Sequence, residues 1–437
     1  MSGFALGLAV LALVGGGAPL PPRPSQSSAA SDDEGWPASR EAGSRGSGSA
    51  VERRLVLMGT EAEVRVTAAD RAAALAASEA AVRALEAAEA RLSTWTEGSE
   101  LARLNQAPVG EPVALSPELA AELAAAEACR RETGRAFDPG VGPLVDAWGL
   151  REGGHLPSPR ELAAARAASG GDGLELRSGG IAVRRRPGLQ IEEGGFGKGA
   201  ALDAALRAVA AYLGVEAAWI DLGGQVAVLS RSPAEVLIAH PADRNRPLLA
   251  LALDRAAGGS VATSGNSERG ITVAGERRSH LLDPRTGEPA PDFGSVTVWA
   301  PTALRADCLS TGLYVLGPEA ALAWAAAHPG VQVVVLRQVP AAGRAGETGA
   351  EGAGAIEVLA TPGLAGRLRV LDPTSVTEIS FGLDSPPGVV PGNEERRGAG
   401  ASDAVEAGRA RRPPSDRGRR VGARRPHDPE ESIYVPF

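Results

Sequence analysis

Cysteine is nearly absent from this chain of 437 residues, which contains only Cys129 and Cys308. Two cysteines are too few for a framework of several disulfides or for a zinc site built from thiolates. A small fold stabilised by disulfides or by zinc is therefore excluded. We expect both side chains to behave as small buried apolar groups.

A basic surface for nucleic acid is also missing from the sequence. The chain has 45 Lys and Arg residues against 53 Asp and Glu, and its formal net charge is -8. Because the basic residues are scattered, they form no electrostatic footprint for a nucleic-acid partner. Aromatic residues make up only 3%, but 43% of the residues are hydrophobic and 22% are charged, which is typical of a globular protein with a sizeable core.

Polar groups are concentrated between Ser260 and Gly317. This stretch contains TSGNSERG, SHLLDPRTGEP, SVTVWAP and RADCLSTGLYVLG, in that order. In the last segment Asp307 and Thr311 stand four residues apart, among apolar residues whose spacing predicts a helix, so a carboxylate and a hydroxyl share one helical face. Two hard oxygen donors suit Mg²⁺, and a helix-capping role for the aspartate is the alternative.

Together these segments resemble the C-terminal half of the FAD:protein FMN transferases, the ApbE family. That family has TSG, HIIDPxTGxP, SVTV and ADAxxT in the same order and at the same separations. Agreement across several segments is more specific than any one motif, and here it extends from about Leu55 to Leu336. The resemblance implies one mixed α/β (α+β) domain over residues 51–382, with helices packed on a sheet and no Rossmann unit.

The start of this region shows strand-like alternation on both sides of a turn at residues 58–60. A long helix rich in Ala, Leu and Glu is expected from Asp70 to about Leu92. The ApbE family carries MGT near its start and a Ser-Thr-aromatic segment further along. The resemblance implies that Met58 and Trp95 lie against the flavin, and a packed surface aromatic is the alternative for Trp95.

A second amphipathic helix is expected over Pro117–Thr133, followed by GRAFDPGVGPLVDAWGL at Gly134–Leu150. The Gly and Pro residues of this segment predict a shaped loop, not the interior of a helix or strand. The family pattern here is FDPxVGPLxxxWG. By resemblance, Ala136, Phe137 and Asp138 contact FAD.

Residues Pro187–Tyr212 predict a strand, the glycine-rich turn GGFGKG and a helix. Bare backbone amides at a helix N-terminus form an anion-binding arrangement, although such a turn also occurs as an ordinary strand-to-helix connection and lacks the spacing of a P-loop. The family counterpart is DLGGIAKG, in which Glu192 replaces the usual Asp. The resemblance implies an FAD contact at Glu192, a metal ligand at the Gly195 carbonyl and a place near the diphosphate for Lys198.

A strand, a Gly-Gly turn and another strand are predicted over Ala217–Ser230, where the two glycines allow the backbone to approach a nucleotide closely. The chain departs from the family at Gln225, where Asp or Asn is usual, and at Asn266 and Ser267 after TSG. In these two segments the FAD contacts implied by the resemblance are Gly223, Gly224, Thr263, Ser264 and Gly265.

The resemblance implies a Mg²⁺-dependent transferase that moves FMN from FAD to a threonine hydroxyl of an acceptor flavoprotein and releases AMP. The metal ligands would be Asp307, Thr311 and the Gly195 carbonyl, and Lys198 would help to neutralise phosphate charge. His280 is the candidate base, because histidine titrates near neutrality. The catalytic set is therefore His280, Lys198 and Asp307.

Two other functions stay open. One is a Mg²⁺-dependent FAD pyrophosphatase, which would use water as the acceptor and form FMN and AMP. The other is a non-catalytic FAD-binding protein, in which Gln225, Asn266 and Ser267 have altered the site. Release of AMP with and without an acceptor protein distinguishes the three. The sequence does not name the acceptor, and a subunit of a membrane redox complex is one partner of the implied kind.

The apolar run Phe4–Leu20 is short for a membrane span but has the length of a signal-peptide core. No Lys or Arg precedes it, and LVGG stands where a lipoprotein would carry a cysteine. Because many members of the resembling family are exported lipoproteins, we expect residues 1–20 to be a signal peptide or membrane anchor. The protein would then be exported, periplasmic or anchored to the inner membrane, and a cytoplasmic protein with an N-terminal tail is the alternative.

Both ends of the chain are expected to be disordered. Residues 21–50 are rich in Pro and Ser and form a linker, and residues 383–437 are rich in Pro, Gly and Arg and form a solvated tail. Between the motifs and this tail, Val331–Leu336 and the segment starting at Val376 predict two more strands.

Overall fold

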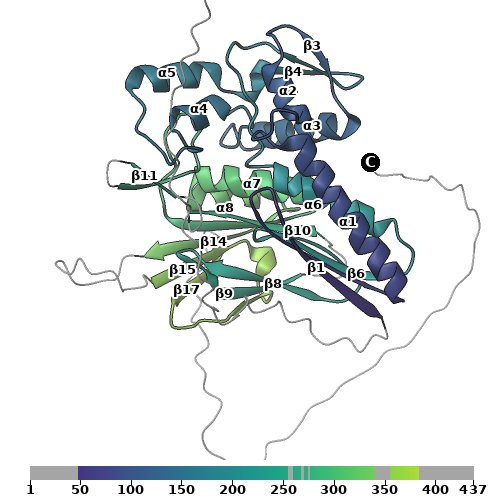
Figure 1. Cartoon of the computed structure of the whole chain (residues 1–437). Coiled ribbons are helices and arrows are strands. Elements are labelled where there is room, and N and C mark those ends of the chain that lie inside the picture. Colours follow the sequence, from purple (N-terminus) through teal and green to yellow (C-terminus); the bar gives the residue numbers. More distant parts are fainter. Residues whose placement is uncertain (1–47, 254–258, 267–269, 274–275, 340–354, 383–437) are drawn as a thin grey trace, which may run out of the picture. The chain divides into compact units, whose positions relative to one another are not determined.

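The structure is a computed structural model that describes residues 48–253, 259–266, 270–273, 276–339 and 355–382 (Figure 1). The predicted leader, the C-terminal tail and most of the predicted linker lie outside these residues. The first described strand begins at Ser49, so the last residues of the predicted linker belong to the fold. Among the described residues, none of the helices is both long and apolar enough to span a membrane.

A large mixed sheet organises the described part of the chain. It contains nine described strands in the order β1-β2-β6-β7-β10-β13-β14-β15-β17. Neighbouring described strands run antiparallel, apart from β15 and β17, which are parallel. The bounds are β1 (Ser49–Leu57), β2 (Thr60–Ala68), β6 (Val215–Leu222), β7 (Gln225–Ser230), β10 (Gly259–Gly265), β13 (Gly294–Ala300), β14 (Gln332–Val339), β15 (Ala355–Ala360) and β17 (Val376–Phe381).

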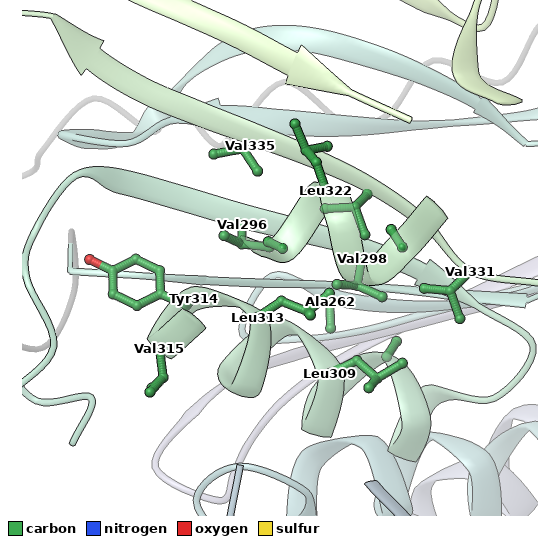
Figure 2. Packing of buried hydrophobic residues seen from close by; sticks show 14 of the residues in the cluster. Ala262, Val296, Val298, Leu309, Leu313, Tyr314, Val315, Leu322, Val331 and Val335 are labelled. Carbon is green, nitrogen blue, oxygen red and sulfur yellow. The ribbon is translucent and has the colours of Figure 1, made fainter. Parts of the chain in front are cut away.

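Helices cover one face of this sheet (Figure 1). The apolar residues of α7 that are spaced three or four apart, including Leu309 and Leu313, pack with Val296 and Val298 of β13 (Figure 2). The α1 and α6 helices cover β2 and β6 in the same way, mostly with alanine and leucine. The covering helices are α1 (Arg71–Leu92), α6 (Gly197–Ala210), α7 (Ala303–Leu316) and α8 (Pro318–Ala326).

The other face of the large sheet packs against a smaller sheet made of β16, β9 and β8. One apolar cluster joins Val228 and Leu336 of the large sheet to Ile238 and Leu249 of the smaller one. Because β13 is covered on both faces, all of its residues are buried. The strands of the smaller sheet are β8 (Ala234–His240), β9 (Asp243–Leu253) and β16 (Leu368–Val370).

A helical region packs on α6 and α7 and carries most of the glycine-rich loops. Its helices are α2 (Glu100–Gln106), α3 (Pro117–Glu132), α4 (Gly142–Ala147) and α5 (Pro159–Ala168). Its strands β3 (Pro112–Ala114), β4 (Leu174–Arg177) and β5 (Ile181–Arg184) form a short sheet, and β11 (Gly270–Val273) pairs with β12 (Glu276–Ser279). Short 3-10 turns cover Gly171–Gly173 and Pro362–Leu364.

The mixed α/β class with helices on a sheet is confirmed, but two local predictions are wrong. The predicted loop Gly134–Leu150 contains α4, because Pro143 lies in the first helical turn, where no backbone N–H is needed. The predicted strand before GGFGKG is irregular, because the side chain of Asn105 binds the chain there in place of a neighbouring strand. Its Nδ2 donates to the Ile191 carbonyl at 2.8 Å, and its Oδ1 accepts from the Ile191 N–H at 2.8 Å.

Both cysteines are buried free thiols, as predicted. Cys129 of α3 and Cys308 of α7 belong to one apolar cluster between these helices. Burial is the first cause of a raised pKa of the Cys308 thiol. Both residues therefore serve as packing groups in the described core.

Candidate functional site

Asp307 is the buried polar centre of the predicted site, with a side chain in α7 and only 1% exposure. Its Oδ2 accepts a hydrogen bond of 2.9 Å from the backbone N–H of Gly199, and its Oδ1 accepts one of 2.8 Å from Nε2 of Gln225. Burial raises the pKa of Asp307, and the nearby charge of Lys198 opposes that rise. The N-cap of α7 is Thr302, so Asp307 does not cap this helix.

The close crossing of α6 and α7 brings Gly199 to Asp307. A Cβ atom at Gly199 would lie 2.3 Å from the carbonyl oxygen of Ala303, so α7 fits directly against bare backbone. Asp203 of α6 ties the helices together, since its carboxylate accepts from the N–H groups of Ala303 at 2.7 Å and Leu304 at 3.0 Å. The start of each helix is therefore held at a set position relative to the other.

Thr311 lies one helical turn after Asp307 and beside the glycine-rich turn. Its Oγ1 is 3.4 Å from Oγ of Ser264 and 3.3 Å from the place that a Cβ atom of Gly195 would occupy. Ser264 also bonds to Ser310 at 2.8 Å. The structure thus brings together Thr311 and the backbone of Gly195, two of the three predicted metal ligands, and joins them to the TSG segment at the end of β10.

Lys198, at the start of α6, lies near the buried carboxylate of Asp307 and the half-buried one of Asp221. Its positive charge lowers the pKa of Asp307 and also that of Asp221, although burial dominates at both and raises the pKa of Asp221 to about 6. Asp221 accepts a bond of 2.8 Å from the N–H of Gly224 in the β6–β7 turn. Gly223 and Gly224 have φ values of 63° and 83°, which only glycine adopts readily, so this turn requires both of them.

On the other side of the turn, an arginine joins the predicted flavin contacts Trp95 and Glu192. The guanidinium of Arg151 lies 5.1 Å from the centre of the Trp95 ring, pairs with Glu192 and donates to Oγ1 of Thr94 at 2.8 Å. Trp95 is 68% exposed, which leaves much of its ring open to a ligand. Burial and the adjacent Glu193 raise the pKa of Glu192 to about 7, although Arg151 opposes the rise.

Met58 completes this side of the site. It takes a left-handed conformation with φ of 49°, and its N–H donates to Oε1 of Glu89 in α1 at 2.6 Å. Its Cε lies 3.2 Å from the place of a Cβ atom at Gly197. The turn between β1 and β2, which the sequence predicts at residues 58–60, is therefore fixed against the start of α6.

Other predicted contacts have structural partners. Ala136 and Phe137 are buried in the core. Asp138 holds a loop, since its Oδ1 accepts from the N–H groups of Gly140 at 2.8 Å and Gly171 at 2.6 Å. Thr263 bonds to Thr297 of β13 at 2.9 Å. The roles of these residues toward FAD stay predictions.

His280 is half-buried and directly follows β12. The preceding Ser279 donates to Oδ1 of Asn266 at 2.8 Å, and Asn266 donates to the Tyr314 hydroxyl at 2.9 Å. The His280 segment is thereby attached to α7, three residues beyond Thr311. Asn266 departs from the family pattern, yet it holds this segment in place, and Ser267 lies outside the described residues.

Sequence reasoning missed several polar groups of the site. Gln225 departs from the family pattern, and no pattern in the sequence indicates its bond to Asp307. The pairing of Arg151 with Glu192 was also missed, although two adjacent carboxylates, Glu192 and Glu193, signal that a cation lies nearby. Glu193 accepts from the hydroxyl of Thr94 at 2.6 Å and so links the turn to the segment that carries Trp95.

The profile of the ApbE family matches residues 58–335, which is more than half of the chain. The chain belongs to the ApbE family. Every site residue predicted from the sequence, from Met58 to Thr311, lies inside the matched range.

Members of this family with curated names include proteins called "FAD:protein FMN transferase". The one from Klebsiella pneumoniae is 34% identical over 277 residues, which cover 60% of this chain and 78% of the relative. The one from Treponema pallidum is 30% identical over 349 residues, which cover 75% of this chain and 91% of the relative.

Solved structures of ApbE proteins share the fold. The flavin transferase ApbE of Vibrio cholerae superposes with a TM-score of 0.58 at 28% identity, over 67% of this chain and 94% of the other. The ApbE protein of Thermotoga maritima superposes with a TM-score of 0.60 at 28% identity, over 66% of this chain and 94% of the other.

The raised pKa of Glu192 predicts a pH-dependent stability of the flavin-free ApbE-family chain. Folded Glu192 holds its proton up to about pH 7, whereas an unfolded glutamate releases it near 4.5, so stability falls as the pH rises between these values. We expect Glu192→Gln to remove up to about 3 kcal/mol of this loss. Urea unfolding at pH 5 and pH 8 measures this difference. Glu235→Gln is the control, because Glu235 also pairs with an arginine, Arg369, but is only half-buried. An equal pH dependence in wild type and Glu192→Gln would contradict the assignment.

Proposed function

We propose that this chain is an FAD:protein FMN transferase that depends on Mg²⁺, modifies a threonine of an acceptor protein and releases AMP. The names of its relatives support the reaction class. The observation that carries the proposal is the buried carboxylate of Asp307 beside Lys198, with Thr311 and the Gly195 backbone one turn away. These groups suit a phosphoryl-type transfer, which mainly requires positioning of the substrate and neutralisation of its charge.

The oxygen donors fit Mg²⁺. Asp307 supplies a carboxylate, Thr311 a hydroxyl and Gly195 a carbonyl, and Mg²⁺ prefers such hard oxygens and keeps water and phosphate ligands as well. Oε1 of Gln225, the amide that binds Asp307, is buried and has no hydrogen-bond partner among the described residues, so a further oxygen acceptor is available beside the carboxylate. The described residues contain no group of three His, Cys, Asp or Glu placed to hold a metal. Asp307 is the one charged ligand of the proposed set.

The other residues of the site would bind the two parts of FAD and move the proton of the acceptor. Mg²⁺ bound at this site would supply positive charge to the phosphate oxygens. Lys198 at the start of α6 would hold the diphosphate with its positive charge. Met58 and Trp95 would contact the flavin, and the arginine stacked on Trp95 would orient its ring. His280 would accept the proton of the threonine hydroxyl as its oxygen bonds to the FMN phosphorus and the bond from that phosphorus to AMP breaks.

The direct test incubates the purified protein with FAD, Mg²⁺ and a threonine-containing acceptor peptide. We expect mass spectrometry to find peptide carrying FMN, with one AMP released for each peptide modified. Removal of Mg²⁺ with EDTA should stop both products, and replacing the acceptor threonine by valine should stop the transfer.

Two results would refute transfer. AMP formed at the same rate without acceptor, and with no modified peptide, would identify an FAD pyrophosphatase. Bound FAD without any AMP would identify a non-catalytic flavin-binding protein.

A further inference from the structure

A cavity of about 510 Å³ lies beside the loop that carries the predicted FAD contacts Ala136 and Phe137. Three separate segments form it: the loop after α3, helix α5 and the turn that follows β12. Its lining residues are Arg135, Ala163, Arg166, Ala167, Pro284 and Arg285. Three arginines and three small apolar residues thus line one cavity.

The arginine on α5 is held against the turn after β12. A Cβ atom at Gly287 would lie 2.8 Å from Cγ of Arg166, so the stem of this arginine packs on bare backbone. Its Nη2 donates to the carbonyl of Arg285 at 3.1 Å, and Trp148 donates to the carbonyl of Gly287 at 2.8 Å. The packing of α5 and the turn therefore places Arg166 and Arg285 side by side.

The positive charge in the cavity is not balanced. Arg285 pairs with Asp283 at 2.8 Å, but Arg135 reaches Asp172 only at 3.4 Å, and that carboxylate lies nearer to Arg186, at 2.9 Å. Arg166 has no ion pair among the described residues, since its side-chain bond goes to a neutral carbonyl. Three arginines line the cavity, and the two carboxylates that pair with them are Asp283 and Asp172, the second of which is shared with Arg186. The formal net charge of the whole chain is -8.

The backbone conformation of Arg135 is energetically unfavourable. Its φ of 70° is in the left-handed region, which is unfavourable for a residue with a side chain. Strained backbone of this kind concentrates where a side chain is needed for function, and here it sets an arginine at the edge of the cavity.

We propose that this cavity binds an acidic segment of the acceptor protein, next to the threonine that receives FMN. This inference rests on the proposed transferase function. Guanidinium groups pair with carboxylates through two parallel hydrogen bonds, and the alanines and Pro284 offer apolar contact to the stems of Asp and Glu side chains. The side chains of Arg135 and Arg285 are 54% and 40% exposed, which suits a partner that arrives from solution. In the chain, Arg135 adjoins Ala136, and Arg285 follows His280 by five residues, so the bound segment would lie near the reaction.

The test uses three labelled threonine peptides that differ only in the flanking residues, which are acidic, amide or basic. We expect fluorescence anisotropy to show at least fivefold tighter binding of the acidic peptide than of the amide peptide, with a preference that falls as salt is added. Arg166→Met should remove the preference, because it deletes a charge without leaving a carboxylate unpaired. Arg103→Met is the matched control, since Arg103 is also exposed and also donates to a backbone carbonyl, that of Gly98.

A charge exchange makes the test specific. Arg166→Glu should weaken the binding of the acidic peptide and strengthen the binding of the basic one. Arg135→Gly should weaken the binding of the acidic peptide. The thermal stability of this variant should equal or exceed that of wild type, because glycine relieves the strain of the left-handed conformation. Loss of preference in Arg103→Met as well, or equal binding of all peptides to wild type, would overturn the proposal. So would binding of inorganic phosphate in the cavity of a wild-type protein that does not bind the acidic peptide.

Transfer is measured separately from binding. If wild type transfers FMN to all three peptides at one rate, the acidic-segment proposal fails and the transferase assignment stands. This holds even if Arg166→Met binds all three peptides alike. If the acidic preference in binding is present but no peptide receives FMN, the transferase assignment fails, and the acceptor role of the cavity fails with it.

Discussion

Asp307→Asn is expected to lower FMN transfer by about 10²–10³-fold and to leave the fold intact. The substitution removes the one charged ligand of the proposed Mg²⁺ site, and charge stabilisation of this kind is worth that much in enzyme sites. The fold should persist because Asn has nearly the same shape, and Gln225 can turn its amide so that its unpaired Oε1 accepts from the new Nδ2. Activity is measured as modified peptide per unit time, over a range of Mg²⁺ concentrations.

The stability of the flavin-free variant provides the control. Burial raises the pKa of Asp307, so its ionised form costs folding free energy at neutral pH. Asn carries no such cost, and the variant should unfold at the same urea concentration as wild type or at a higher one. Excess Mg²⁺ should restore part of the activity. Wild-type turnover at ordinary Mg²⁺ would disprove the metal role of Asp307.

Gly199→Ala is expected to destabilise the protein by about 3 kcal/mol. In an exposed helix this change is favourable by about 1 kcal/mol, because alanine has the higher helix propensity. Here the added methyl group would lie 2.3 Å from the Ala303 carbonyl oxygen and 2.6 Å from Cα of Leu304, so α6 and α7 must separate. Urea unfolding monitored by circular dichroism measures the loss.

Gly330→Ala is the matched control, because a Cβ atom there meets nothing within 4 Å. Its unfolding free energy should stay within about 0.5 kcal/mol of wild type. Gly199→Ala should also lower transfer at temperatures where the protein is still folded, since the Gly199 N–H is a hydrogen-bond donor to Asp307. A variant as stable as wild type would show that the contact between the helices is looser than described.

Local features of the fold could be predicted from the sequence. The turn at residues 58–60, the helix that begins after Asp70 and the hairpin around Gly223 each depend on alternation, a capping side chain or glycine, which act within a few residues. The spacing of Asp307 and Thr311 on one helix is local in the same sense. The motif blocks also indicated the family, which the comparisons confirmed. The export of the chain stays a prediction.

Contacts between distant segments could not be predicted in this way. The irregular chain before α6 depends on Asn105, which lies 86 residues from its partner Ile191. The bond of Gln225 to Asp307 spans 82 residues, and the tight approach of α6 to α7 is set by which faces the two helices bury.

The distribution of charge differs most clearly between the sequence and the folded chain. Along the sequence the basic residues are scattered in an acidic chain, and this alone indicated no basic surface. Folding gathers Arg135, Arg166 and Arg285 around one cavity, although the first and last of them are far apart in the chain. The sequence by itself determined most of the elements and the family, because these follow from short-range pattern. Only the tertiary structure decided which charges are paired and which stay available, because that depends on the packing of whole elements.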